Sequence, residues 1–130
     1  MTRDLVTVDV TDSLTEVNKI FGQVKIRHLP VMAHKTLVGI ISKTDMLRIS
    51  FGSTFGDDQL DADEAIFDML SINQVMKHSP VTVSTHQTIV EAAEILASRE
   101  FHALPVTEYN KLVGIVTTTD IIKYFIGQSR

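Results

Sequence analysis

The chain has 130 residues, of which 44% are hydrophobic and 22% are charged, a composition that suits one compact globular unit. Its net charge of −4 argues against the basic excess of a broad nucleic-acid surface, and the absence of cysteine excludes disulfides, thiolate catalysis and cysteine-based zinc sites. No stretch approaches the roughly 18 consecutive apolar residues that span a membrane, and Met1–Leu5 lacks the apolar core of a secretion signal, so we expect a soluble, cytoplasmic protein.

The first predicted elements are a short strand and a helix. Val6–Val8 is a β-prone run, and Ser13 with Glu16 forms the pattern of a capping box, which predicts a helix that begins after Ser13. Apolar residues then recur at helical spacing and form a single stripe: Val17, Ile20, Phe21 and Val24.

Two strands and a second helix follow. We expect a strand over Leu29–Met32, a polar turn over Ala33–Thr36 and a nearly all-apolar strand over Leu37–Ile41, a run typical of a strand that is buried on both faces. Ser42–Asp45 then opens a helix that contains Met46, Leu47 and Ile49. The element order predicted for residues 1–50 is therefore β-α-β-β-α.

Residues 51–70 form a predicted connector that is acidic and contains no lysine or arginine. We expect a short helix from about Asp61, with Ile66, Met69 and Leu70 facing inward. A solvated connector is the favoured interpretation, and an acidic docking surface for a partner is the alternative.

The rest of the chain, residues 71–130, repeats the first copy. Pro30 recurs as Pro105, an offset of 75 residues (105 − 30 = 75), and the same offset relates five segments without a gap. The segments are Met1, Val6–Val8, Leu29–Val31, Leu37–Ile40 and Thr44–Asp45, which recur as Met76, Val81–Val83, Leu104–Val106, Leu112–Ile115 and Thr119–Asp120. Thr88–Glu91 repeats the capping pattern, and the apolar stripe of the helix that follows contains Ile89, Ala92, Ala93 and Leu96.

One segment of the second copy has no counterpart in the first. Ser71–Val75 precedes Met76, whereas the first copy begins directly at Met1. Either the chain is trimmed at its N-terminus or the first copy lacks this piece.

The ordered motifs Arg27–Val31, Leu37–Ser42 and Thr44–Asp45, repeated as His102–Val106, Gly114–Thr118 and Thr119–Asp120, resemble a tandem pair of cystathionine-β-synthase (CBS) domains. The resemblance covers nearly the whole chain except the acidic connector. It implies an α/β fold in which two repeats pack through their sheets about a pseudo-twofold axis, and it implies a homodimer. It further implies a regulatory module that senses energy state or another signal by binding AMP, ADP, ATP or S-adenosylmethionine in clefts between the repeats.

The residues of one candidate ligand site lie at the start of the last helix of each copy. Backbone N–H groups there favour a phosphate, threonine hydroxyls donate to phosphate or ribose, and a carboxylate accepts hydrogen bonds from a ribose diol. The residues of this set are Ser42, Thr44 and Asp45 in the first copy and Thr117, Thr119 and Asp120 in the second. Ser42 with Asp45 and Thr117 with Asp120 are also helix-capping pairs, a purely structural role that remains open.

Further candidates precede each Leu-Pro-Val motif. Ile26 and Phe101 are suited to flank an adenine ring. A role in the hydrophobic core is the alternative for both residues, and for Ile26 it is the favoured one. Arg27 and His102 are candidates for phosphate contacts, helped in the first copy by Lys43. The two clefts are therefore not equivalent: a polyphosphate would prefer the one near Arg27 and Lys43, and a less charged adenosine ligand the other.

Catalysis is not predicted. The five histidines show no metal-ligand spacing, and no nucleophile-elbow, Walker or dinucleotide-binding motif occurs. We therefore expect a non-enzymatic ligand sensor that needs no cofactor and regulates an unidentified effector protein, without nucleic-acid or membrane contact. The alternative is a ligand-free structural module whose role is dimerisation.

Overall fold

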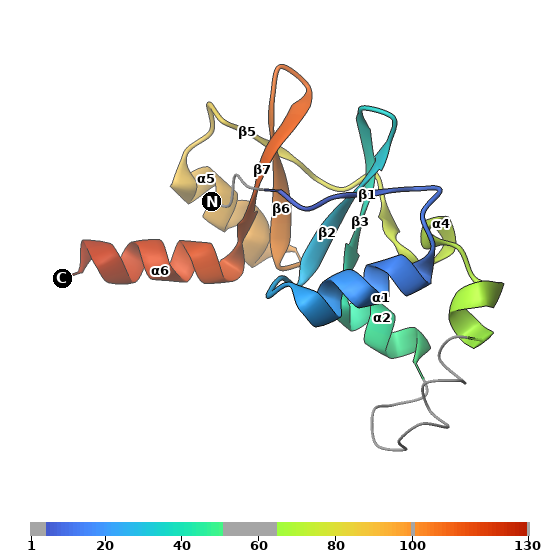
Figure 1. The fold of residues 1–130 in the computed structure, drawn as a ribbon. Coiled ribbons are helices and arrows are strands. Elements are labelled where there is room, and N and C mark those ends of the chain that lie inside the picture. The colour runs from blue at the N-terminus through green and yellow to red at the C-terminus, as the bar shows by residue number, and fades with distance from the viewer. Residues whose placement is uncertain (1–4, 51–64, 100, 130) are drawn as a thin grey trace. The chain divides into compact units, whose positions relative to one another are not determined.

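The computed structural model describes residues 5–50, 65–99 and 101–129, which divide into two compact units. One unit spans Val6–Ser79, and the other contains Pro80–Arg130. Each unit is an α/β structure in which helices pack on a small sheet, and in the second unit α6 contacts its sheet mainly through its first turn (Figure 1). The predicted α/β class with two β-α-β-β-α repeats is confirmed.

In the first unit the five expected elements occur in the expected order: β1 (Val8–Asp9), α1 (Leu14–Gln23), β2 (His28–Ala33), β3 (Thr36–Ser42) and α2 (Lys43–Ile49). Two further elements, which were not predicted, complete the unit: α4 (Ile72–Val75) and β4 (Lys77–His78). The sheet order is β1-β2-β3-β4, with β1 parallel to β2 and the other pairs antiparallel.

The second unit repeats this arrangement with three strands. Its elements are β5 (Val83–Ser84), α5 (Ile89–Ser98), β6 (Ala103–Glu108), β7 (Lys111–Thr117) and α6 (Thr118–Gln128). Val106 pairs with Gly114 as Val31 pairs with Gly39, and both hairpins shift register just after that valine. Duplication is therefore visible in the hydrogen-bond register as well as in the sequence.

Helix starts follow the capping rules. The side chains of Ser13 and Thr88 accept hydrogen bonds from the backbone N–H three residues later. For Thr88 the box is complete, because its backbone N–H also donates to the carboxylate of Glu91. In the hairpin between β6 and β7, Tyr109 and Asn110 have φ values of 51° and 65°, the left-handed pair that a two-residue turn requires.

The connector contributes to the core of the first unit. Residues 65–69 are helical, as expected, but the side chain that is buried there is Phe67, and Met69 is exposed, so the inward orientation of Met69 was wrong. Phe67, Ile72 and Met76 belong to the same buried cluster as Leu14 and Val17. The expected start of this helix near Asp61 lies outside the described residues.

Candidate functional site

The turns that open α2 and α6 carry the predicted polar residues. In the first unit, Oδ2 of Asp45 accepts the backbone N–H of Ser42 at 2.9 Å, and Oγ of Ser42 accepts that of Asp45 at 3.0 Å. In the second, Thr117 and Asp120 form the same reciprocal pair at 2.9 and 3.1 Å. Both pairs are complete capping boxes, so each aspartate holds the first turn of its helix.

The remaining oxygen of each aspartate has a different environment. Oδ1 of Asp45 lies 3.4 Å from Nζ of Lys77 and 3.5 Å from Nη1 of Arg48, and the Asp45 side chain is only 6% exposed. Asp120 is half-buried, and in the part of the chain that the structure describes its Oδ1 forms neither a hydrogen bond nor an ion pair. The carboxylate of Asp120 therefore has one oxygen without a bond among the described residues, whereas both oxygens of Asp45 are engaged within its own unit.

Sequence reasoning missed these partners of Asp45. Lys77 lies 32 positions away and meets Asp45 only because β4 pairs with β3, an event that no local pattern predicts. Arg48 lies one helical turn after Asp45, a spacing that could have indicated it.

The other predicted residues lie near these turns, each within its own unit. Lys43 donates its backbone N–H to the carbonyl of Arg27 at 2.8 Å, so this bond brings together two exposed basic residues. Thr118 and His102 make the equivalent bond at 2.9 Å. Thr44 and Thr119, which follow the cap residues Ser42 and Thr117 by two positions, are exposed.

Ile26 and Phe101 are half-buried and pack against the hydrophobic clusters of their own units. This placement agrees with the core interpretation of Ile26. It gives Phe101 a core role as well.

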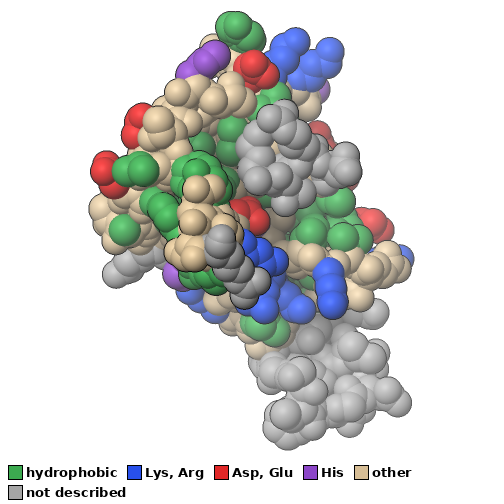
Figure 2. Space-filling view, turned by 90° about the vertical axis from the view of Figure 1, so that its left-hand side faces the viewer, with side chains coloured by type: hydrophobic (Ala, Val, Ile, Leu, Met, Phe, Trp, Pro, Cys, Tyr) green, Lys and Arg blue, Asp and Glu red, His purple; other side chains and the backbone are tan. Residues whose placement is uncertain are grey.

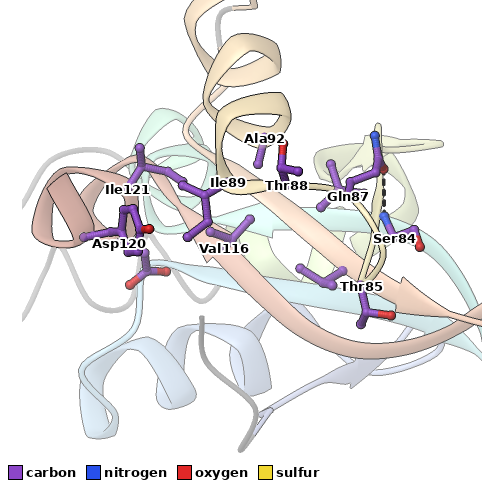
Figure 3. Close-up of a pocket in the computed structure, with 12 residues that line it drawn as sticks. Ser84, Thr85, Gln87, Thr88, Ile89, Ala92, Val116, Asp120 and Ile121 are labelled. Carbon is purple, nitrogen blue, oxygen red and sulfur yellow. Dashed lines mark hydrogen bonds between the residues drawn. The ribbon is translucent and has the colours of Figure 1, made fainter. Parts of the chain in front are cut away.

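A pocket of about 290 Å³ lies in the second unit, between α5, α6 and the sheet. Asp120 and Ile121 stand at one end, Ser84, Thr85 and Gln87 at the other, with Ile89 and Val116 between them (Figure 3). The backbone N–H of Ser84 donates to Oε1 of Gln87 at 2.8 Å, which shapes the polar end. Apart from Asp120, none of the residues that line this pocket was predicted from the sequence to belong to a ligand site.

Within the described residues, no helix combines the length and the apolar character that crossing a bilayer requires. The same residues contain no group of three or more histidine, aspartate or glutamate side chains placed to hold a metal ion.

The CBS-domain family model matches residues 1–52 and 72–127. Among curated proteins, the chain is 28% identical over 127 residues to protein MJ1225 of Methanocaldococcus jannaschii, covering 96% of this chain and 45% of that protein. The chain thus spans less than half the length of this relative.

Two solved structures with bound ligands are similar to the whole chain. The AMP complex of CBSX2, a CBS-pair protein of Arabidopsis thaliana, has a TM-score of 0.79 and 26% identity, and the match covers all of this chain and 95% of that one. The CBS domain pair of protein MJ0100, in complex with 5′-methylthioadenosine and S-adenosyl-L-methionine, has a TM-score of 0.76 and 25% identity, with 98% and 93% covered.

Proposed function

Because the chain belongs to the CBS-domain family and contains two of its repeats, we propose that it is a regulatory module that binds an adenosine-containing ligand through its second repeat. Ligand binding would then change the state of a partner protein. We further propose that the module is not an enzyme, that it forms a homodimer and that it acts in the cytoplasm.

The observation that carries this proposal is the carboxylate of Asp120. Its Oδ2 holds the N-terminus of α6, which fixes the side chain, and its Oδ1 accepts no bond from any described residue. A fixed carboxylate with one available oxygen is suited to a ribose hydroxyl, because the donor meets a preorganised acceptor.

The first repeat differs from the second in its charge and in the accessibility of its aspartate. Its aspartate is buried and paired with Lys77 and Arg48, so a ribose would have to displace two cations. Arg27 and Lys43 nevertheless lie together on this unit, and they favour phosphate groups. We therefore propose that the second repeat binds the adenosine moiety of a ligand with little charge, and that a polyphosphate would prefer the surface near Arg27 and Lys43.

The two ligand-bound relatives support the ligand class. CBSX2 binds AMP, and MJ0100 binds 5′-methylthioadenosine and S-adenosyl-L-methionine. These compounds share the adenosine group, and only the 5′ substituent differs. A site that reads the ribose through Asp120 would accept this whole class.

Regulation requires a ligand that binds one conformation of the protein more tightly than another. A ligand with equal affinity for both states shifts no equilibrium. The module would therefore signal through a conformational preference that an effector protein detects.

A ligand-free dimerisation module is the second candidate, and one observation favours it. Helix α6 exposes several large apolar side chains, namely Ile122, Tyr124, Phe125 and Ile126. Figure 2, which views the molecule from the side on which the C-terminus lies in Figure 1, shows hydrophobic side chains at the surface among polar ones. Such residues favour self-association.

Thermal unfolding in the presence of AMP, ADP, ATP, S-adenosylmethionine and GTP separates the two candidates. A ligand at 100 times its Kd stabilises the folded state by about 2.7 kcal/mol, which raises the melting temperature clearly. We expect an adenosine compound to stabilise the wild type and Asp45→Asn but not Asp120→Asn. If no compound stabilises any of the three proteins, the dimerisation module is the better account.

A further inference from the structure

The inference concerns Lys77, which engages the aspartate of the first repeat. Its Nζ lies 3.4 Å from Oδ1 of Asp45, and Nη1 of Arg48 lies 3.5 Å from the same oxygen. Oδ2 of Asp45 accepts the backbone N–H of Ser42 at 2.9 Å, and the Asp45 side chain is only 6% exposed. Lys77 and Arg48 therefore hold the carboxylate oxygen of Asp45 that the helix cap does not use.

The strand that carries Lys77 is fixed within its own unit. Lys77 pairs with Ile40 in the antiparallel ladder between β4 and β3. The preceding residue, Met76, is buried in the hydrophobic cluster of the first unit. The following residue, His78, donates a hydrogen bond from Nε2 to the carbonyl oxygen of Asn73 at 2.7 Å. The backbone from which Lys77 reaches Asp45 is therefore held by contacts on both sides of the lysine.

A comparison at the repeat offset separates the roles of Lys77 and Arg48. Arg48 corresponds to Lys123, so both repeats carry a cation three residues after the aspartate. Lys123 is exposed, and among the residues that the structure describes it forms no ion pair with Asp120. A cation at this helix position is therefore not sufficient to engage the aspartate, and Lys77 is the contact that distinguishes the first repeat.

Lys77 and a ribose would compete for the same oxygen of Asp45. The contact between an ammonium group and a carboxylate carries charge on both partners, whereas a ribose hydroxyl is neutral and forms the weaker bond. Because Asp45 is nearly buried, water screens its attraction to Lys77 less than it would at an open surface. The Lys77 side chain itself is 54% exposed, so a substitution there leaves the core intact.

We propose that Lys77 excludes adenosine from the first repeat, because its ammonium group occupies the acceptor that a ribose diol requires. Lys77 is then the specificity-determining residue of this repeat, and a neutral side chain at position 77 gives the chain a second adenosine site. The proposal rests on the proposed function, in which Asp120 binds the ribose of an adenosine ligand, and it names the residue that keeps Asp45 from doing the same.

Isothermal titration with adenosine tests this assignment. Adenosine carries a ribose diol but no phosphate, so the loss of a lysine cannot weaken a phosphate contact. Every chain in the series carries Asp120→Asn, which removes the acceptor of the second repeat, and thermal unfolding checks that each variant is folded. Lys77→Met removes the charge and keeps most of the aliphatic chain, whereas Lys77→Arg keeps the charge. Lys35→Met is the matched control for net charge, because Lys35 is exposed in the turn between β2 and β3 and is not one of the cations paired with Asp45.

Lys77→Met is expected to bind one adenosine per chain, roughly tenfold more tightly than its parent with Lys77 intact. Lys77→Arg and Lys35→Met should bind no more tightly than the parent. Adding Asp45→Asn to Lys77→Met should abolish the new site, since the ribose acceptor is then lost. With Asp120 intact, Lys77→Met should raise the stoichiometry from one adenosine per chain to two.

Three results would overturn the role of Lys77. Lys77→Met could gain no site, Lys77→Arg or Lys35→Met could gain the same site, or the new site could persist after Asp45→Asn. Failure of the proposed function gives a different pattern: the wild type would bind no adenosine compound, or Asp120→Asn would bind adenosine as the wild type does. In either case a gain in Lys77→Met that requires Asp45 still supports the exclusion by Lys77, and the absence of a gain contradicts it.

Discussion

The two repeats have the same hairpin register and the same capping box at their second helix, but they differ in what surrounds that helix. In the first unit, Phe67 and Ile72 join the core and Lys77 reaches Asp45. In the second unit, the equivalent Asp120 has one oxygen without a bond among the described residues, and Ile89 and Tyr124, the equivalents of Leu14 and Ile49, border a pocket. The difference teaches that the duplicated sequence determines the strands and helices of each repeat, whereas the exposure of its polar and apolar side chains depends on the segment that packs beside it.

The largest effect is expected from shortening one side chain at the start of the first helix of each repeat, at equivalent positions. Leu14→Ala should lower the free energy of unfolding by about 3 kcal/mol, because a fully buried leucine leaves a cavity. Ile89→Ala should cost about 1 kcal/mol, because Ile89 already borders open space. Urea unfolding measures both values, and equal losses would refute the contrast in packing.

A second comparison concerns two glycines of the first unit. Gly39→Ala should cost about 1–3 kcal/mol, because the added methyl group meets the Met76 sulfur and lies 2.9 Å from the Lys77 carbonyl oxygen. Gly22→Ala is the matched control: nothing lies within 4 Å, and alanine in helix α1 should stabilise the protein by about 0.5–1 kcal/mol. Thermal unfolding of both variants checks the predicted opposite signs.

The two aspartates provide the next comparison. Asp120→Ala should cost about 1 kcal/mol, since it removes one partner of a capping box. Asp45→Ala should cost about 2 kcal/mol, because the half-buried N–H of Ser42 and the two cations Lys77 and Arg48 lose their partner together. Urea unfolding measures both losses. A larger loss of unfolding free energy in Asp120→Ala than in Asp45→Ala would show that the ion pairs of Asp45 contribute no net stability.

The smallest effect is expected at Asp9, which corresponds to Ser84 in the second repeat. Hydrogen bonds from the hydroxyl of Thr11 at 2.6 Å and from its backbone N–H at 2.9 Å lower the pKa of the Asp9 carboxyl, with a smaller contribution from His34. A pKa that is lower in the folded state stabilises the protein above the unfolded-state pKa, and this stabilisation is lost as the pH falls through the folded-state pKa. Asp9→Asn should therefore lower the free energy of unfolding slightly at neutral pH, and it should have no effect below the folded-state pKa of Asp9. Urea unfolding at several pH values measures this difference.

A loss that is independent of pH would show that the Asp9 charge is not responsible. Ser84→Ala is the control, because serine does not titrate in this range and its effect should not vary with pH.

The frame of the fold was predictable because its determinants are local. Capping residues such as Ser42 and Thr117, and the apolar runs of β3 and β7, are adjacent in sequence to the elements that they define. The inward position of Met69 was wrong because the phase of a short helix depends on what it packs against, and Phe67 faces the core instead.

The candidate site was predictable only in part, for the same reason. The Thr117–Asp120 pair could be recognised from its spacing, but the contrast between Asp45 and Asp120 arises from Lys77, which approaches through the pairing of β3 with β4. The pocket is bordered by Ile89 and Tyr124, both of which are partly exposed, and this tertiary property is not revealed by the helical stripe of α5.

The central claim, that the second repeat offers the ribose acceptor, is tested most directly by isothermal titration of the wild type, Asp45→Asn and Asp120→Asn with AMP. The account predicts one site per chain in the wild type and in Asp45→Asn, and no binding to Asp120→Asn. Loss of binding in Asp45→Asn with full binding in Asp120→Asn would contradict it, since the working aspartate would then lie in the first repeat.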